Sequence, residues 1–510
     1  MLPAATIVAA SLAMAAPAFA QQPPQAPGAQ AASEALAVAA ATLEPQGQAG
    51  PAAEATLAMN ALAAALPELE GAERKRARSL LARPTDGAAD QFRHGYPPAA
   101  PVAVAESPHF CVYWVNDPGF PDAPDLTDGD GDGIPDYVEA ILEIAEHSYS
   151  VEVEPGALGW LPPKPDTQGC GGDPSAHADV YLKQLGTQGL FGYESPDPGQ
   201  GRARSQYGYM VIDDDYATAE YGYRDPLEPA SVTFAHEFNH LLQQNYDSFQ
   251  DRWMFEATAT WSEEFVYPAV NDYVNYIGAF ASSPGAPITD PTAARGLKIY
   301  GAAAWNHWLS GSGGGYGVDA VRRAWEVSAA TRPRDFAVGA YNKSIRDSKG
   351  NGFSREFAAF AAATAEWRTG SGGFPDRALY PDMKRKGSLR KGQSRRLRLD
   401  HTAIRLLEVR ARGNRAIRLC LRAEDGVRAG LALVARAGDA LSGRVIRKSE
   451  YLRKGGNGAV RLDSPGRFER ITAVISNADG RVKGFDGTDW IYRRDDQDFR
   501  VRLKGASAGR

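Results

Sequence analysis

The chain has 510 residues, of which 43% are hydrophobic, 23% charged and 10% aromatic. This composition is typical of a soluble globular protein and excludes a wholly disordered or fibrous chain. After the extreme N-terminus there is no run of about eighteen or more apolar residues, which excludes a multi-span membrane protein. The length predicts about three domains.

The charged residues are unevenly distributed along the chain. Residues 381–510 contain 32 Lys and Arg against 15 Asp and Glu, a net charge of +17. Residues 1–380 contain 24 basic and 47 acidic residues, a net charge of −23. This asymmetry predicts separate domains, and it suggests that the basic one meets an anionic partner. The alternative is that the basic and acidic parts dock on each other.

Residues 1–20 have the features of a secretory signal peptide. They are small and apolar and end in Ala18-Phe19-Ala20, an A-x-A cleavage motif, although no Lys or Arg precedes the apolar stretch. We therefore expect a secreted protein with no transmembrane anchor in its mature form, the periplasm and the cell surface being alternative destinations. Residues 21–105 are rich in Ala, Pro and Gln, with a helical segment expected around 66–81. This composition fits a linker, a loosely ordered segment or a pro-segment.

The globular part is predicted to begin near residue 106, with a strand at 110–115. An acidic turn leads into a predicted helix at 137–147, and two further strands are expected at 178–182 and 209–212. Residues 231–380 are predicted to be mainly helical. The expected helix breaks lie at 268, 284–291, 311–315 and 333.

Short apolar segments separated by Gly, Asp and Asn follow residue 390. The segments expected to be strands are 395–399, 405–409, 416–421, 430–435, 459–462, 471–476 and 499–503. Their spacing predicts an antiparallel β-sandwich. The predicted fold class is therefore α+β, with a small sheet and a mostly helical part over 106–380 and a basic β-sandwich over 381–510.

The segment Ser231-VTFAHEFNHLLQQNYD contains an H-E-x-x-H arrangement, formed by His236, Glu237 and His240. On a helix, residues i and i+4 share one face, so both imidazoles can bind one metal ion. Glu237 then lies beside a metal-bound water, where a carboxylate acts as general base. The alternative is a pair of buried histidines that bind no metal.

A catalytic zinc ion needs a third protein ligand while one position stays open for water. The metzincin pattern requires Gly and His three and six residues after His240, where this chain has Gln243 and Tyr246. A thiolate ligand is not expected either, because no Cys lies between residues 170 and 420. The remaining pattern places a Glu on a following helix.

The segment Trp253-MFEATATWSEEF supplies such a glutamate. A short connection precedes it, so two antiparallel helices can face each other. We predict that Glu256 is the third zinc ligand. Glu263 and Glu264 are alternatives, although their adjacent positions fit better with a solvated pair or with a pair that supports the ligands from behind.

Together, His236-Glu237-x-x-His240 and Trp253-x-x-Glu256-Ala-x-Ala-x-Trp261 resemble the motifs of gluzincin metallopeptidases. In aminopeptidases of that clan the second motif reads W-x-x-E-G-x-A. This chain departs from the pattern in having Ala257 in place of Gly and only fifteen residues between His240 and Glu256. The order of its segments is also similar to that of a little-characterised group of secreted bacterial metalloproteases with a D-x-D-x-D-G-x-P-D calcium loop.

The resemblance implies a gluzincin-like fold and a zinc-dependent endopeptidase that acts on protein or peptide substrates. It also implies a Tyr or His that donates a hydrogen bond to the oxygen that gains charge during the reaction. Tyr300 and His307 are the candidates by position, with a core or surface role as the alternative for each. For Asp213, Asp214 and Asp215 we favour a solvated acidic loop over a ligand-orienting role or an ion site.

Residues 128–139 match a twelve-residue EF-hand calcium loop position by position. The predicted ligands are Asp128, Asp130, Asp132, the Ile134 carbonyl, Asp136 and Glu139, with Gly133 at the sharp turn. The alternative is a polar surface turn. The preceding DPGFPDAPDL cannot form a helix, so we expect a structural Ca²⁺ rather than an opening sensor.

The sequence thus predicts a secreted zinc endopeptidase in which Glu237 deprotonates a metal-activated water. The alternative is a secreted binding or attachment protein that keeps an inactive zinc-peptidase scaffold. For residues 381–510 the predicted partner is an anionic cell-envelope polymer. Few aromatic residues are interleaved with the cations, so specific nucleic-acid binding is not expected. If a disulfide forms, Cys111–Cys170 is the expected pair.

Overall fold

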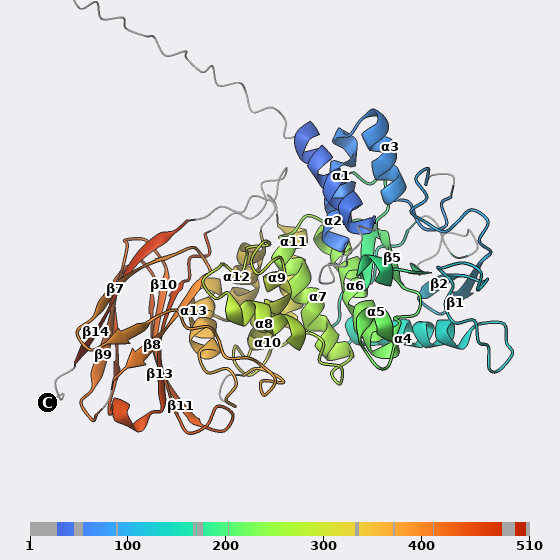
Figure 1. Cartoon of the computed structure of the whole chain (residues 1–510). Helices are drawn as coiled ribbons and strands as arrows, with labels where there is room; N and C mark the ends of the chain where they lie inside the picture. Colours follow the sequence, from blue (N-terminus) through green and yellow to red (C-terminus); the bar gives the residue numbers. More distant parts are fainter. Residues whose placement is uncertain are drawn as a thin grey trace, which may run out of the picture.

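The computed structural model describes residues 28–44, 55–87, 90–166, 170, 177–201, 203–331, 336–370, 373–411, 413–481 and 495–505. The expected signal peptide, residues 1–20, lies outside these residues. Within them, no helix combines the length and the apolar character needed to cross a membrane. The fold is mixed, with helices and several sheets, and the C-terminal strands lie at the opposite end of the molecule from the first strands (Figure 1).

A five-stranded sheet forms the centre of the N-terminal half, with the strand order β1-β2-β3-β5-β4. The strands are β1 (Val102–Glu106), β2 (Phe110–Val115), β3 (Ala178–Lys183), β4 (Gly192–Pro196) and β5 (Gly208–Asp213). The middle strands β2, β3 and β5 are parallel, and β1 and β4 pair antiparallel at the two edges. The three middle strands coincide with the segments predicted to be strands, whereas β1 and β4 were not predicted.

Helices cover both faces of this sheet, because its strands are apolar on both sides. Alternate residues such as Val180 and Met210 pack with helices α4 (Asp136–Glu152) and α6 (Leu227–Asp247). Their neighbours Tyr181 and Tyr209 face the other side and pack with the N-terminal helices. The period-2 alternation of a strand therefore divides the core into two layers.

The N-terminal helices are α1 (Ala29–Leu43), α2 (Thr56–Ala65) and α3 (Gly71–Leu80). Their apolar side chains, among them Leu36, Met59 and Leu62, are buried against the sheet. A loosely ordered linker, one of the expectations for 21–105, does not describe these residues. The Ala-rich composition that suggested low complexity also has high helix propensity, and the sheet supplies the face on which the helices pack.

The short helix α5 (Thr218–Tyr221) precedes α6, and the remaining α-helices follow α6 in the chain. They are α7 (Arg252–Val266), α8 (Val274–Ser282), α9 (Lys298–Gly301), α10 (Ala303–Ser310), α11 (Asp319–Ala330), α12 (Ala337–Asp347) and α13 (Phe353–Thr364). The predicted breaks at 268, 284–291 and 311–315 fall between these helices, and the break predicted at 333 lies outside the described residues. A disulfide joins Cys111 on β2 to Cys170, and Cys420 is free.

Two stacked sheets form the C-terminal region, in the orders β11-β10-β13-β8-β6 and β12-β9-β14-β7, around a shared apolar core. Their strands are β6 (Ser388–Arg390), β7 (Ser394–Leu399), β8 (Ile404–Arg410), β9 (Ile417–Ala423), β10 (Ala429–Ala437), β11 (Arg444–Leu452), β12 (Gly456–Leu462), β13 (Arg470–Asn477) and β14 (Gln497–Gly505). The pairing is antiparallel as predicted, except that β6 pairs parallel with β8. Edge strand β11 was missed because it is largely exposed and carries no regular apolar alternation.

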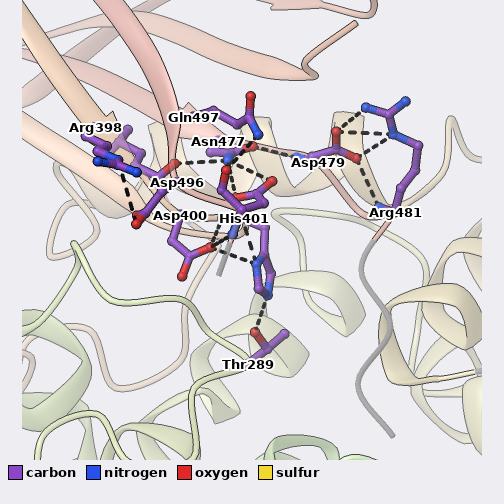
Figure 2. Close-up of polar contacts among 11 residues, drawn as sticks. Thr289, Arg398, Asp400, His401, Asn477, Asp479, Arg481, Asp496 and Gln497 are labelled. Atoms are coloured by element: carbon purple, nitrogen blue, oxygen red, sulfur yellow. Dashed lines mark hydrogen bonds and ion pairs between the residues drawn. The ribbon is translucent and has the colours of Figure 1, made fainter. Parts of the chain in front are cut away.

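Polar contacts join the C-terminal sheets to the helical part. His401 Nε2 lies 2.8 Å from the Thr289 hydroxyl, and His401 Nδ1 lies 3.0 Å from the carboxylate of Asp400 (Figure 2). On another side of the junction, Arg436 on β10 donates to the buried Glu366 at 3.0 Å. The first sheet of the C-terminal region is thus the one that meets the helices.

Candidate metal centre

Helices α6 and α7 bring together the three predicted zinc ligands. His236 and His240 lie one turn apart on α6, and their Nε2 atoms lie 3.3 and 3.5 Å from the same oxygen, Oε2 of Glu256 on α7. All three side chains are almost completely removed from solvent. The short α6–α7 connection produces this arrangement, as the sequence predicted.

The spacing of these atoms fits a tetrahedral metal ion. Zn²⁺ binds nitrogen and oxygen ligands at about 2.0–2.1 Å, which places tetrahedral ligands about 3.3–3.4 Å apart. In addition, the buried atoms His240 Nε2 and Glu256 Oε1 have no hydrogen-bond partner. A cation placed between the three side chains would satisfy both atoms. The residues present therefore fit zinc.

The other nitrogen of each imidazole is held by an acceptor. His236 Nδ1 lies 2.6 Å from Oε1 of Glu263, and His240 Nδ1 lies 2.9 Å from Oε1 of Gln243. With its proton on Nδ1, each ring directs the Nε2 lone pair toward Glu256. Glu263 is therefore buried behind a ligand and does not belong to a solvated pair.

A chain of hydrogen bonds between buried side chains leads from Gln243, the partner of His240, to helix α4. The Gln243 side chain donates to Asn239 Oδ1 at 2.6 Å, and Asn239 in turn donates to Glu152 Oε2 at 2.6 Å. Burial raises the pKa of Glu152 to about 8. Glu152 lies at the end of α4, so α4 and α6 together hold the orientation of His240. The H-E-x-x-H motif does not specify Gln243, Asn239 or Glu152, and no sequence signal marks their roles.

The electrostatics of the three ligands favour a charged carboxylate. Burial acts to raise the pKa of Glu256, but the neighbouring His240 and His236 outweigh burial and lower this pKa to about 2. Burial acts to lower the pKa of His240, but the negative charge of Glu256 outweighs burial. The pKa of His240 is therefore raised. Glu256 is thus anionic at neutral pH, which suits it to hold a cation.

Glu237, the predicted general base, is completely buried. Its Oε2 accepts a hydrogen bond of 2.7 Å from the Thr56 hydroxyl of helix α2. It also faces strand β4, because a Cβ atom added to Gly192 would lie 3.3 Å from Glu237 Cγ and 2.8 Å from Thr233 Cγ2. Glycine at position 192 therefore allows the edge strand to approach α6 closely.

The two oxyanion candidates lie in different places. The Tyr300 ring stacks on His236 with a centroid distance of 6.1 Å, so Tyr300 lies beside the ligands. His307 instead packs on Tyr273 and borders a separate cavity of about 360 Å³. Burial lowers the pKa of His307 to about 3. The described contacts thus bring Tyr300, and not His307, to the metal ligands.

A cavity of about 510 Å³ borders the metal centre. Its walls include Glu263, Thr233 and two tyrosines that sequence reasoning did not single out, Tyr223 and Tyr276. Tyr276 stacks on Tyr300 at 5.1 Å, and the Tyr223 hydroxyl donates to Asp272. The cavity reaches the candidate ligands through Glu263, whose carboxylate lies 2.6 Å from His236 Nδ1.

The acidic group after β5 was predicted to be a solvated loop, and this interpretation is wrong. Asp213 and Asp214 are buried. Asp213 accepts hydrogen bonds from the backbone N–H groups of Leu185, Gly186 and Tyr216 at 2.7–2.9 Å. Asp213 therefore organises the loops at the end of the sheet, a role that depends on contacts distant in sequence.

The predicted calcium loop precedes α4, and three of its acidic side chains lie close together on the surface. Oxygens of Asp128, Asp130 and Asp132 lie within 4.8 Å of one another. Asp128 accepts hydrogen bonds from the N–H groups of Gly131 and Gly133, which lower its pKa. Gly133 has a φ of +96°, as the sharp turn requires.

The last two predicted carboxylate ligands lie at the start of α4. Asp136 accepts a hydrogen bond from Gly129 N–H at 2.8 Å, and Ile134 N–H donates to Asp132 at 2.8 Å. Partial burial raises the pKa of Glu139, and the loop carboxylates, Asp130 first among them, raise it further. The loop therefore concentrates negative charge where the sequence predicted Ca²⁺.

Comparisons with known proteins give little further information. No protein-family model and no curated protein matches the chain. The pre-peptidase C-terminal domain of collagenase from Bacillus anthracis is similar over 24% of this chain and 100% of its own, with 9% identity and a TM-score of 0.14. A family GH115 4-O-methyl-α-glucuronidase, BtGH115A, with specificity for decorated arabinogalactans, is similar over 55% of this chain and 39% of its own, with 12% identity and a TM-score of 0.13. Neither likeness is close enough to support an argument.

The contact between Glu263 and His236 predicts an effect on zinc affinity. Glu263→Ala should lower the affinity about 10- to 100-fold, because His236 loses the acceptor that orients its ring. Glu264→Ala is the matched control and should leave the affinity unchanged, since no described contact joins Glu264 to a ligand. Competition with a chromophoric chelator measures both. Equal affinities in the two variants would contradict the supporting role of Glu263.

The calcium loop predicts a ligand-dependent stability. Ca²⁺ that binds only the folded state stabilises it by mass action, so the midpoint of thermal unfolding should rise with millimolar Ca²⁺. Glu139→Gln should remove most of the rise, whereas Glu143→Gln, an exposed position one turn along α4, should not. Mg²⁺ should substitute poorly because it prefers smaller octahedral sites. A wild-type midpoint that does not respond to Ca²⁺ would exclude the site.

Proposed function

We propose that the chain is a secreted zinc-dependent endopeptidase of gluzincin type, with a structural Ca²⁺ in the loop at 128–139. The observation that carries the proposal is the spacing of His236, His240 and Glu256, with a buried carboxylate, Glu237, next to the first ligand. The apolar residues 1–20 and the Cys111–Cys170 disulfide support export, because disulfides persist in oxidising compartments.

The reaction would proceed through this chain's own groups as follows. Zinc held by the three ligands would polarise the scissile carbonyl and make a water acidic enough to react. The Glu237 carboxylate would accept the proton of that water and then pass it to the departing amine. Tyr300 lies beside His236 and would donate a hydrogen bond to the carbonyl oxygen as that oxygen gains charge.

The walls around the site would fix the orientation of a peptide. Strand β4 is an edge strand, so its outer backbone groups can pair with an extended chain. The adjoining cavity, lined by Tyr223 and Tyr276, would accept a side chain. These features favour a substrate that is bound through its backbone along β4 and placed in register by a side chain in the cavity.

The role of Glu237 gives the test of this function. Glu237→Gln should keep near-stoichiometric zinc and lose at least ~10²-fold in the rate of casein hydrolysis, because a general base contributes about 10²–10⁴-fold. Glu228→Gln, an exposed position on the same helix, is the control and should keep full activity. Metal content and chelator-sensitive hydrolysis by the purified secreted protein provide the measurements. A fully active Glu237→Gln variant would overturn the mechanism.

A further inference from the structure

Helix α2 lies against the candidate active site, where Thr56 makes two buried hydrogen bonds. Its hydroxyl donates to Glu237 Oε2 at 2.7 Å and accepts the backbone N–H of Glu194 on β4 at 2.8 Å. Thr56 is completely removed from solvent. The first residue of α2 thus engages both the proposed general base and the strand edge along which a peptide would pair.

A second contact follows one turn later on α2. Asn60 accepts a hydrogen bond from the side chain of Gln244, which also donates to Glu194 Oε2 at 2.9 Å. Because Thr56 and Asn60 are four residues apart, they share one helix face, as do Glu237 and Gln244 two turns apart on α6. Helices α2 and α6 therefore contact each other through polar side chains over more than one turn.

The rest of the N-terminal segment is firmly docked. Arg83, just after α3, is buried and donates to Asp197 at 2.7–2.8 Å and to Asp166 at 2.7 Å, and it also pairs with Asp179 on β3. The Tyr209 hydroxyl of β5 donates to the Ala82 carbonyl at 3.0 Å. Helix α2 is thus part of a segment that packs on the sheet like a core element.

From these contacts we infer that residues 28–44 and 55–83, here named the inhibitory segment, block the site and must be displaced before the chain can act. The inference rests on the proposed function. One of the two oxygens of Glu237, the proposed general base, already accepts the Thr56 hydrogen, and α2 occupies the space along β4. An extended peptide would need the same Glu194 N–H that Thr56 now uses.

Removal of one hydroxyl tests the inference in the zinc-loaded full chain. Thr56→Val keeps the shape of the side chain but removes the hydrogen bond from Thr56 to Glu237, so α2 should dissociate more often. A hydrogen bond to a buried carboxylate is strong enough that the affinity for a peptide hydroxamate and the rate of peptide hydrolysis should both rise at least ~10-fold. Titration calorimetry and a fluorogenic peptide measure the two effects.

Two controls accompany this variant. Thr56→Ser restores the hydroxyl and should behave like the wild type. Thr42→Val removes a hydroxyl that bonds only within α1, to the Val38 carbonyl, and should change neither readout. Unchanged hydroxamate affinity in Thr56→Val would overturn the inference. If the hydroxamate binds more tightly but no form cleaves peptides, the inhibitory contact stands and the peptidase assignment fails.

A separate observation concerns the outer face of the sheet β12-β9-β14-β7. Leu419, Leu421 and Val501 point into the core, so the alternate residues point outward. The outward residues with long cationic side chains are Arg396 and Arg398 on β7, Arg418 and Arg422 on β9, Arg461 on β12, and Arg500, Arg502 and Lys504 on β14. We name this set the arginine face.

Cations stand directly opposite one another on this face. Arg500 pairs in register with both Arg396 and Arg422, and Arg418 pairs with both Lys504 and Arg461. Like charges in directly opposite positions destabilise a sheet. Among the described residues, no ion pair with an acidic side chain compensates Arg396, Arg418, Arg422, Arg500, Arg502 or Lys504, while Arg398 and Arg461 have Asp496 and Asp463 nearby.

The arginine face is not the surface that docks on the helical part. Helix α13 packs on β10, and Glu366 pairs with Arg436 of the same strand. Strand β10 belongs to the other sheet, β11-β10-β13-β8-β6. In Figure 1 the strands β9 and β14 lie on the side away from α13. Docking between the acidic and basic parts therefore uses a different set of arginines and leaves this face exposed.

We propose that the arginine face binds a linear acidic polysaccharide. Its outward positions carry no aromatic side chain among the described residues, so unpaired bases have no ring on which to stack. It also offers no large apolar side chain for insertion into a bilayer. A flat array of guanidinium groups instead suits repeated carboxylates, which arginine binds through paired hydrogen bonds.

Charge reversal tests this surface in the full chain. The double variant Arg422→Glu/Arg500→Glu should weaken binding to polygalacturonate at low salt at least ~10-fold, and wild-type binding should weaken as salt is added. Arg444→Glu/Lys448→Glu, on exposed positions of β11 in the other sheet, makes the same change in charge and should keep wild-type binding. Equal losses in both double variants, or tighter binding to single-stranded DNA or anionic vesicles at equal charge, would overturn the proposal.

Discussion

Helix α6 is buried over nearly its whole length, and its polar side chains must all find partners inside the protein. Unpaired buried polar groups are costly, so the surrounding elements are arranged to satisfy them. Glu263 on α7 serves His236, Thr56 on α2 serves Glu237, and Glu152 on α4 serves Asn239. The space between His236, His240 and Glu256 is left for a cation, because His240 Nε2 and Glu256 Oε1 have no hydrogen-bond partner there. The candidate metal centre is therefore one of the places on this helix where buried polar atoms lack a protein partner, as Gln244 Oε1 also does.

The sequence was sufficient for the parts of this site that depend on local geometry. Residues four apart on a helix share a face, and a short connection brings the next helix alongside, so His236, His240 and Glu256 could be predicted to meet. The contacts around them could not. Thr56 and Glu237 are 181 residues apart, and nothing in an Ala-rich helix marks one threonine as the donor to a buried carboxylate.

The fold shows the same division between local and distant information. Strands with β-branched or aromatic runs, such as β2, could be predicted, whereas β4 could not. Its sequence, Gly192–Pro196, has glycine and proline at its ends, and it forms a strand because β5 lies beside it. Asp213 and Asp214 looked like solvent-exposed residues for the same reason, since their burial comes from loops elsewhere in the chain. The count of charged residues likewise predicted the difference in net charge between residues 1–380 and 381–510. It could not predict how the cations of 381–510 are divided between the two C-terminal sheets.

The Cys111–Cys170 disulfide ties together the elements that support the ligands. It closes a loop across a sequence separation of 59 residues, and that loop contains both the calcium-loop residues and α4. Closing a loop of this length reduces the entropy of the unfolded chain, which corresponds to about 4 kcal/mol of stability. Because Glu152 at the end of α4 supports His240 through Asn239 and Gln243, the disulfide restrains a candidate metal ligand that it does not touch. Maturation of the site is thereby linked to the redox state of the compartment in which the chain folds.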